Sequence, residues 1–82
     1  MPEIQALADN VVKIRKTMHL NQAEFSWEVG ISIEELSLIE RGKANPRLLT
    51  LQKIAAFTGL SVSDLLQVDE DSDIKTTADN QN

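Results

Sequence analysis

The sequence contains no cysteine and no tyrosine, a single histidine, and only 4% aromatic residues. Without cysteine the chain has neither disulfides nor thiolate metal sites, which agrees with a reducing cytoplasm. His19 alone cannot build a histidine metal centre, and so few rings do not form a base-stacking platform for single strands. No apolar run approaches the roughly 18 residues that span a bilayer, and residues 1–4 do not resemble the start of a signal peptide. We therefore expect a small cytoplasmic domain without metal or cofactor.

The formal net charge of −5 over 82 residues is distributed unevenly. Residues 69–82 hold five acidic side chains and one base, whereas residues 1–68 hold eight acids and seven bases. The acidic segment has too few apolar side chains to offset the entropy of ordering. We therefore predict a folded domain over residues 1–67 and an acidic, disordered tail over residues 68–82. A domain of this size without disulfides often gains stability from a partner chain.

Helical periodicity and capping residues divide the folded part into its elements. Apolar residues at three- and four-residue spacing predict a first helix of about four turns. These residues are Ile4, Leu7, Val11, Ile14 and Met18. Asn21 followed by Glu24 forms the pattern of a capping box, so a second helix begins there. Phe25 and Val29 give that helix its apolar face, and Gly30 ends it.

Three further signals define the remaining helices. Ser32 with Glu35 repeats the capping pattern, which predicts a third helix that runs to about Arg41 and ends at Gly42. Pro46 disfavours helical geometry at the residue before it, so residues 43–47 form a loop. A fourth helix follows and ends at Gly59. Its buried residues are predicted to be Leu48, Leu51, Ile54 and Ala55. A short fifth helix is capped by residues 61–64, with Leu65 and Leu66 turned inward.

No segment alternates between apolar and polar residues long enough to indicate a strand. We therefore predict an all-α fold of five helices. Two short helices joined by about three residues that include Gly30 match a helix-turn-helix unit, whose second helix enters the major groove of DNA. The same spacing also fits any small helical bundle, because tight helical corners are common.

The chain resembles the lambda-repressor-like, Cro/C1-type (XRE) helix-turn-helix family over residues 7–66. The resemblance rests on several stretches taken together: Leu20-Asn21-Gln22-Ala23-Glu24-Phe25, Gly30-Ile31-Ser32, Ile39-Glu40-Arg41-Gly42-Lys43, Asn45-Pro46, Leu51-Gln52-Lys53-Ile54-Ala55 and Gly59-Leu60-Ser61-Val62-Ser63-Asp64-Leu65-Leu66. It implies a five-helix lambda-repressor-like bundle that binds double-stranded DNA, regulates transcription and comes from a bacterium or prophage. A homodimer is expected because two half-sites fit two copies of one reading helix, and its surface is expected at the fifth helix and the chain after it.

The resemblance also implies roles for individual side chains. Gln22 falls where the family places a glutamine near a phosphate or base edge. Arg15 and Glu40 fall where the family pairs an arginine of the first helix with a glutamate, as a brace of the motif or a purely structural ion pair. Lys43 and Arg47 flank the loop that runs along the phosphates, although solvated loop charges are the alternative.

The predicted recognition helix departs from the family's usual polar and basic surface. If Leu36 and Ile39 face the core, as their i, i+3 spacing indicates, the outward side presents Ile33, Glu34, Ser37, Leu38 and Arg41. These five and Ser32, which precedes them, are the expected contacts of this helix with DNA. Aliphatic side chains can pack on thymine methyl groups, and a glutamate can accept a hydrogen bond from cytosine N4. Exposed aliphatic side chains can equally bind protein.

Trp27 lies on the second helix at a position that is usually polar in the family. A lone tryptophan is more often a partly buried packing residue than an interface anchor, although tryptophan is a favoured hot-spot residue.

Our interpretation is a sequence-specific, double-stranded-DNA-binding transcriptional regulator of the phage-repressor type. The alternative is a protein-interaction module on the same scaffold, such as an antitoxin-like or anti-repressor subunit. An enzyme is not expected, because no nucleophile and base form a pair.

Overall fold

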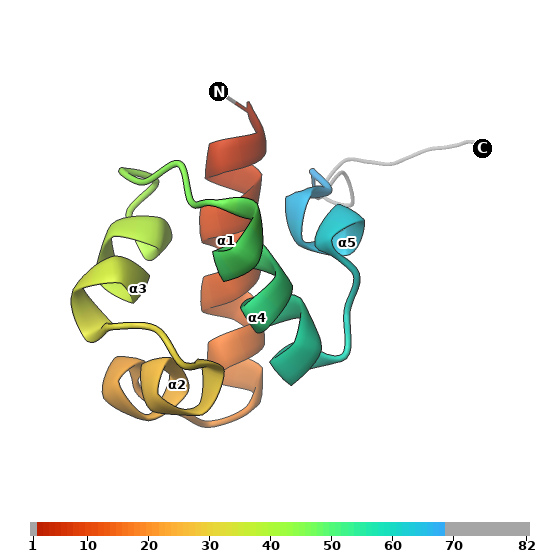
Figure 1. Cartoon of the computed structure of the whole chain (residues 1–82). Coiled ribbons are helices and arrows are strands. Elements are labelled where there is room, and N and C mark those ends of the chain that lie inside the picture. Colours follow the sequence, from red (N-terminus) through yellow and green to blue (C-terminus); the bar gives the residue numbers. More distant parts are fainter. Residues whose placement is uncertain (1, 69–82) are drawn as a thin grey trace.

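The computed structural model describes residues 2–68, which form five α-helices and no strand within that range (Figure 1). The helices are α1 (Pro2–Thr17), α2 (Gln22–Val29), α3 (Ile33–Glu40), α4 (Leu48–Thr58) and α5 (Val62–Leu66). This confirms the all-α, five-helix prediction. The predicted acidic tail after Val68 lies outside the described residues, so the prediction that it is disordered stays a prediction.

The helix boundaries follow the capping residues. The Asn21 side chain accepts a hydrogen bond from the Glu24 backbone N–H, and the Glu24 carboxylate accepts one from the Asn21 N–H, each at 2.8 Å. Ser61 and Asp64 form the same reciprocal box at the start of α5. Gly30 and Gly59 end α2 and α4 in the left-handed region, with φ of 89° and 78°, where an L side chain is strained.

The cap of α3 differs from the predicted one. Ser32 Oγ accepts from the Glu35 N–H at 3.0 Å, as expected. The Glu35 carboxylate does not return to Ser32. Instead it accepts a hydrogen bond from Thr50 Oγ1 of α4 at 3.1 Å. The predicted reciprocal box is therefore wrong, because α4 brings a hydroxyl donor within reach and the carboxylate links the two helices.

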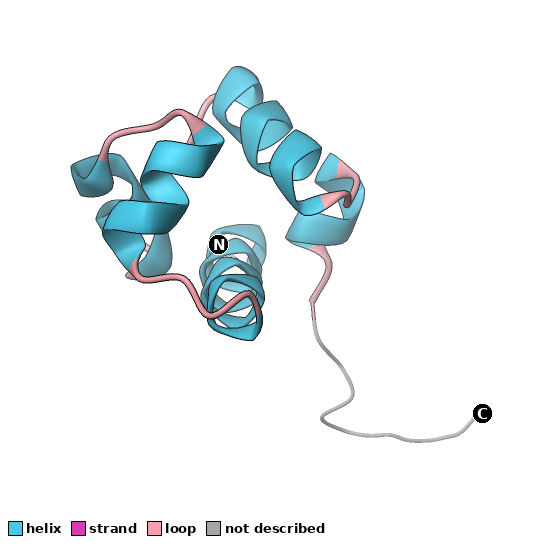
Figure 2. Ribbon diagram, turned by 90° about the horizontal axis from the view of Figure 1, so that it is seen from below, coloured by secondary structure: helices cyan, strands magenta, loops and turns pink. Residues whose placement is uncertain are grey.

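The core forms around α1, which Figure 2 shows nearly end-on with the other helices beside it. Every helix contributes at least one buried apolar side chain, and the largest fully buried ones are Leu7, Val11, Phe25, Leu36, Ile39, Ile54 and Leu65. The rings of Phe25 and Phe57 meet edge to face, with centroids 5.6 Å apart. The Asn10 side chain of α1 donates to the backbone oxygens of Leu65 and Gln67, at 2.8 and 2.9 Å. These bonds attach the end of α5 to α1.

Leu48 is not in the core, contrary to the prediction, since 60% of it is exposed. Helical side chains point toward the N-terminus of their helix, so the side chain of the first residue projects beyond the helix end. The buried stripe of α4 begins one turn later, at Leu51. Met18 is also partly exposed, because it follows the last residue of α1.

Candidate nucleic-acid interface

The turn between α2 and α3 is fixed by backbone and side-chain hydrogen bonds. The Ser26 carbonyl oxygen accepts from the N–H groups of Gly30 and Ile31, at 2.9 and 3.1 Å. Lys53 Nζ of α4 donates to the Gly30 carbonyl at 3.3 Å. The left-handed Gly30 thus turns the chain, and Ser32 caps α3 two residues later. Two short helices are held at a fixed angle, which is the geometry of a helix-turn-helix unit.

A network centred on Glu40 joins α1, α2 and α3. Arg15 Nε and one terminal nitrogen of Arg15 donate to the two carboxylate oxygens of Glu40, at 2.6 and 3.0 Å. Gln22 Nε2 donates to Glu40 Oε1 at 2.9 Å, and the remaining terminal nitrogen of Arg15 donates to the Leu20 carbonyl at 3.0 Å. The ion pair implied by the resemblance is therefore present. Its extension to Gln22 was not predicted, and no spacing signal links residues 18 positions apart.

Burial and hydrogen bonding act in opposite directions on the charge of Glu40. The side chains of Arg15 and Glu40 are only 13% and 6% exposed. Burial alone raises the pKa of Glu40, but the hydrogen bonds from Arg15 and Gln22, with the charges of Arg15 and Lys16, lower it below its ordinary value. The hydrogen bond to Glu40 raises the pKa of Arg15 despite its burial. Both groups are therefore charged at neutral pH.

The outward side of α3 and the start of α2 enclose an open hollow of about 400 Å³. We call the six residues that line it the reading face, and they are Gln22, Ile33, Glu34, Ser37, Leu38 and Arg41. All six belong to the nine side chains predicted to contact DNA. Of the other three, Ser32 caps α3, while Lys43 and Arg47 are exposed in the loop before α4 and do not line the hollow.

The reading face combines aliphatic and charged groups. Ile33 and Leu38 are 41% and 40% exposed, whereas Leu36 and Ile39 are buried, as the i, i+3 spacing predicted. Arg41 Nε donates to the Ser37 carbonyl at 3.3 Å, which leaves the terminal nitrogens of the guanidinium open to other acceptors. Within residues 2–68 the Glu34 carboxylate forms no hydrogen bond or ion pair.

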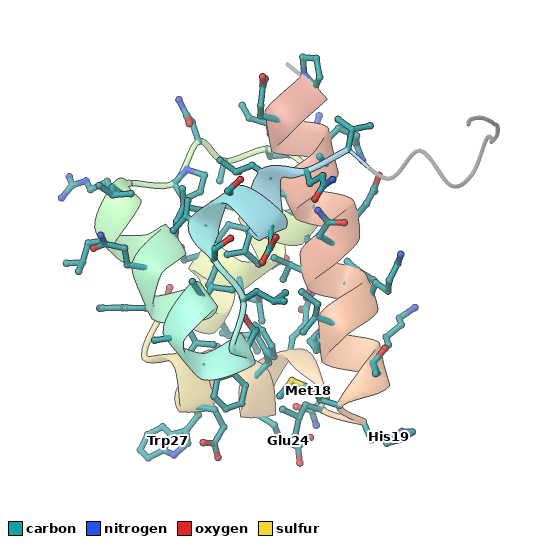
Figure 3. The ribbon with its side chains drawn as sticks, turned by 90° about the vertical axis from the view of Figure 1, so that its right-hand side faces the viewer. Met18, His19, Glu24 and Trp27 are labelled. Atoms are coloured by element: carbon teal, nitrogen blue, oxygen red, sulfur yellow. The ribbon has the colours of Figure 1, made fainter. Side chains whose placement is uncertain are left out.

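Trp27 does not pack against the core, so the favoured interpretation of this residue is wrong. It is 83% exposed and projects from the lower edge of the molecule in Figure 3. Phe25 occupies the core instead, because the buried face of α2 passes through Phe25, Ser26 and Val29. Trp27 follows Gln22 by five residues, about 140° around the helix, and does not line the hollow.

Metal clusters and membrane-spanning helices are both absent from the described part of the chain. In residues 2–68 no three acidic, histidine or cysteine side chains gather as a metal site would require. None of the five helices is long and apolar enough to cross a membrane.

Comparisons with known proteins agree with this geometry. A family model described as helix-turn-helix matches residues 11–65. The chain is 36% identical over 61 residues to the HTH-type transcriptional regulator DdrOP3 of Deinococcus deserti, covering 74% of this chain but only 47% of that protein, so it spans about half of that relative. It is 33% identical over 60 residues to an uncharacterised HTH-type transcriptional regulator of Sinorhizobium fredii, covering 73% of this chain and 78% of that protein.

Two solved structures share the fold. A hypothetical transcription factor from Neisseria matches with a TM-score of 0.78 and 26% identity, over 85% of this chain and 80% of that chain. An HTH_3 family transcriptional regulator from Vibrio cholerae matches with a TM-score of 0.70 and 30% identity, over 77% of this chain and 35% of that chain.

Proposed function

Because the chain belongs to the Cro/C1-type (XRE) helix-turn-helix family of DNA-binding transcriptional regulators, which are not enzymes, we propose that it is a sequence-specific regulator of the phage-repressor type. In this proposal α3 lies in the major groove of double-stranded DNA, and the protein acts in the cytoplasm at the nucleoid. The single observation that carries the proposal is the reading face, since six side chains from α2 and α3 converge on one open hollow. The major groove, about 12 Å wide, admits an α-helix.

The network around Glu40 supports this orientation. Gln22 is the first residue of α2, and its side chain is held by Glu40 through the Nε2 donor, so its amide oxygen remains available. The N–H groups at the start of α2 offer further donors to a phosphate. Arg15 also donates to both carboxylate oxygens of Glu40. We infer that the network positions the start of α2 on the DNA backbone while α3 faces the bases.

The basic side chains of the proposed interface fall into two groups. Arg41 lines the hollow, and its free terminal nitrogens suit the O6 and N7 acceptors of guanine. Lys43 and Arg47 are exposed in the segment between α3 and α4, where they suit phosphates and do not read sequence. Because residues 1–68 are nearly neutral overall, DNA affinity depends on this local arrangement and not on net charge.

We further propose that the protein binds DNA as a homodimer. A symmetric pair presents two α3 helices to half-sites about one helical turn apart, roughly 10 base pairs from centre to centre. The expected dimer surface, at α5 and the chain after it, includes the half-exposed Val68. An operator of this kind has two related half-sites.

The test is selection of random duplexes by the purified protein, followed by affinity measurements over a range of salt concentrations. The proposal expects a motif with two related half-sites and an affinity that falls steeply with salt. Insertion of five base pairs between the half-sites rotates one of them by about half a turn and should abolish cooperative binding. Recovery of no preferred sequence would overturn the proposal.

The exposure of Trp27 favours a second function, a protein-interaction module on the same scaffold. Trp27 is the most exposed large hydrophobic side chain of residues 2–68, and tryptophan is enriched at binding hot spots. Ile33 and Leu38 could also serve such an interface. This alternative expects Trp27→Ser, or the pair Ile33→Ala and Leu38→Ala, to abolish capture of a defined partner while any DNA affinity stays unchanged. Loss of DNA selectivity in the Ile33 and Leu38 variants would decide against it.

A further inference from the structure

Glu34 differs from the other two glutamates of α3. Glu35 accepts a hydrogen bond from Thr50, and Glu40 is held by Arg15 and Gln22. Within the described residues the Glu34 carboxylate has no partner, although it lines the hollow of the reading face. A structural role therefore accounts for Glu35 and Glu40 but not for Glu34.

The two exposed aliphatic side chains of α3 lie close to this carboxylate. Leu38 follows Glu34 by four residues, which places their Cβ atoms about 5–6 Å apart on one side of the helix. Ile33 is the adjacent residue. All three line the same hollow, and Ile33 and Leu38 are about 40% exposed. The hollow thus sets one hydrogen-bond acceptor beside apolar surface.

Few groups in the major groove fit that combination. The donors are the amino groups of cytosine N4 and adenine N6, and the apolar group is the C5-methyl of thymine. In an A·T pair the thymine O4 acceptor lies between the amino group and the methyl, where it would repel a carboxylate. In cytosine the amino group is attached to C4, and C5 is the adjacent ring atom. A methyl at cytosine C5 would therefore lie directly beside the donor.

On the basis of the proposed function, we propose that the reading face recognises a pyrimidine C5-methyl group next to a cytosine amino group. Glu34 accepts the hydrogen bond from cytosine N4, and Leu38 or Ile33 packs on the methyl. Two sources supply this chemistry. A 5-methylcytosine carries both groups on one base, and an unmodified cytosine followed by a thymine carries them on neighbouring bases.

The experiment uses the full chain and the duplex recovered by selection. Each thymine is replaced in turn by deoxyuridine, which removes one methyl, and each cytosine by 5-methylcytosine, which adds one. Affinities are measured for the wild type, Leu38→Ala, Ile33→Ala and the matched control Leu60→Ala. The exposed fraction of Leu60, 38%, is similar to the 40% of Leu38, but Leu60 does not line the hollow. Circular dichroism checks that each variant is folded.

If 5-methylcytosine is the source of the methyl, the affinity rises about fourfold when one cytosine is methylated. If thymine is the source, the affinity falls about fourfold when one thymine is replaced by deoxyuridine. Each change corresponds to the burial of one carbon. In either case Leu60→Ala keeps the effect, whereas Leu38→Ala or Ile33→Ala removes it. If every replacement stays within twofold, or if neither variant removes the effect, the inference is wrong while the proposed function stands. If no duplex is selected, the proposed function fails and the inference fails with it.

Discussion

Glu40 is the residue on which the relative placement of the first three helices depends. Its side chain is only 6% exposed, and its two oxygens accept from two nitrogens of Arg15 and from Gln22. We predict that Glu40→Gln lowers the free energy of unfolding by about 3 kcal/mol, because removing one partner leaves a buried charge uncompensated. Urea unfolding measures the change. The matched control is Glu28→Gln, an exposed acid of α2, which should stay within about 0.5 kcal/mol of the wild type.

The pKa of Glu40 gives this ion pair a definite pH dependence. The pKa of Glu40 is lower in the folded protein than its ordinary value of about 4.3. Its contribution to stability is therefore complete above that value and is lost as the pH falls through the lower, folded value. We expect the difference in stability between wild type and Glu40→Gln to be constant near pH 7 and to shrink below about pH 4. A difference that persists unchanged into acid would show that charge is not its cause.

Glu34 allows a direct test of whether α3 reads bases. We predict that Glu34→Gln raises the affinity for non-specific DNA, because it removes a charge that phosphates repel. It should also shift the preference at a single base pair by about 1–3 kcal/mol, because an amide pairs with adenine. Duplex selection by both proteins measures the shift, with Glu28→Gln as the control. An identical motif at every position would remove Glu34 from the proposed readers.

At the level of the helices, starts and ends could be predicted because their signals are local. Asn21 with Glu24, and Ser61 with Asp64, satisfy backbone donors within three residues, so the sequence alone identifies these helix starts. Gly30 ends α2 for an equally local reason, since its φ is positive. The buried pair Leu36 and Ile39 followed from helical periodicity, and the outward side of α3 followed from that pair.

The contacts that depend on how helices pack could not be predicted. The hydrogen bond between Thr50 and Glu35, and the one between Gln22 and Glu40, join residues 15 and 18 positions apart. Hydrophobicity predicts Leu48 in the core, but at the first position of α4 it is 60% exposed, whereas Leu51 one turn later is buried. Trp27 lies on the exposed side of α2, although its residue type favours burial.

The loop between α3 and α4 is the element that we expect to contact phosphates. We predict that Lys43→Ala and Arg47→Ala weaken binding to all duplexes by similar factors. Each should flatten the slope of log affinity against log salt by about one unit, if each side chain meets one phosphate. Measurements on a selected and an unrelated duplex separate this effect from base reading. An unchanged slope in the double variant would remove the loop from the interface.

At the level of the whole molecule, the attachment of α5 limits what the segment after it contributes to folding. Asn10 of α1 binds the carbonyl oxygens of Leu65 and Gln67, and Val68 is 49% exposed. We predict that truncation after Gln67 changes the melting temperature by only a few degrees. Thermal unfolding followed by circular dichroism is the measurement. A cooperative loss of helix would show that residues 68–82 complete the fold or a dimer.

The position of the single tryptophan makes Trp27 an intrinsic fluorescence probe of this protein. With no tyrosine in the chain, ultraviolet emission comes almost entirely from one indole on the solvent side of α2. We expect red-shifted emission that acrylamide quenches readily even in the native state, so fluorescence is a poor measure of core unfolding. Duplex DNA bound through α3 should leave the emission maximum unchanged, whereas a protein that covers α2 should shift it to shorter wavelengths. A fluorescence titration of the unmodified protein therefore distinguishes binding of α3 in the DNA groove from binding of a protein over α2.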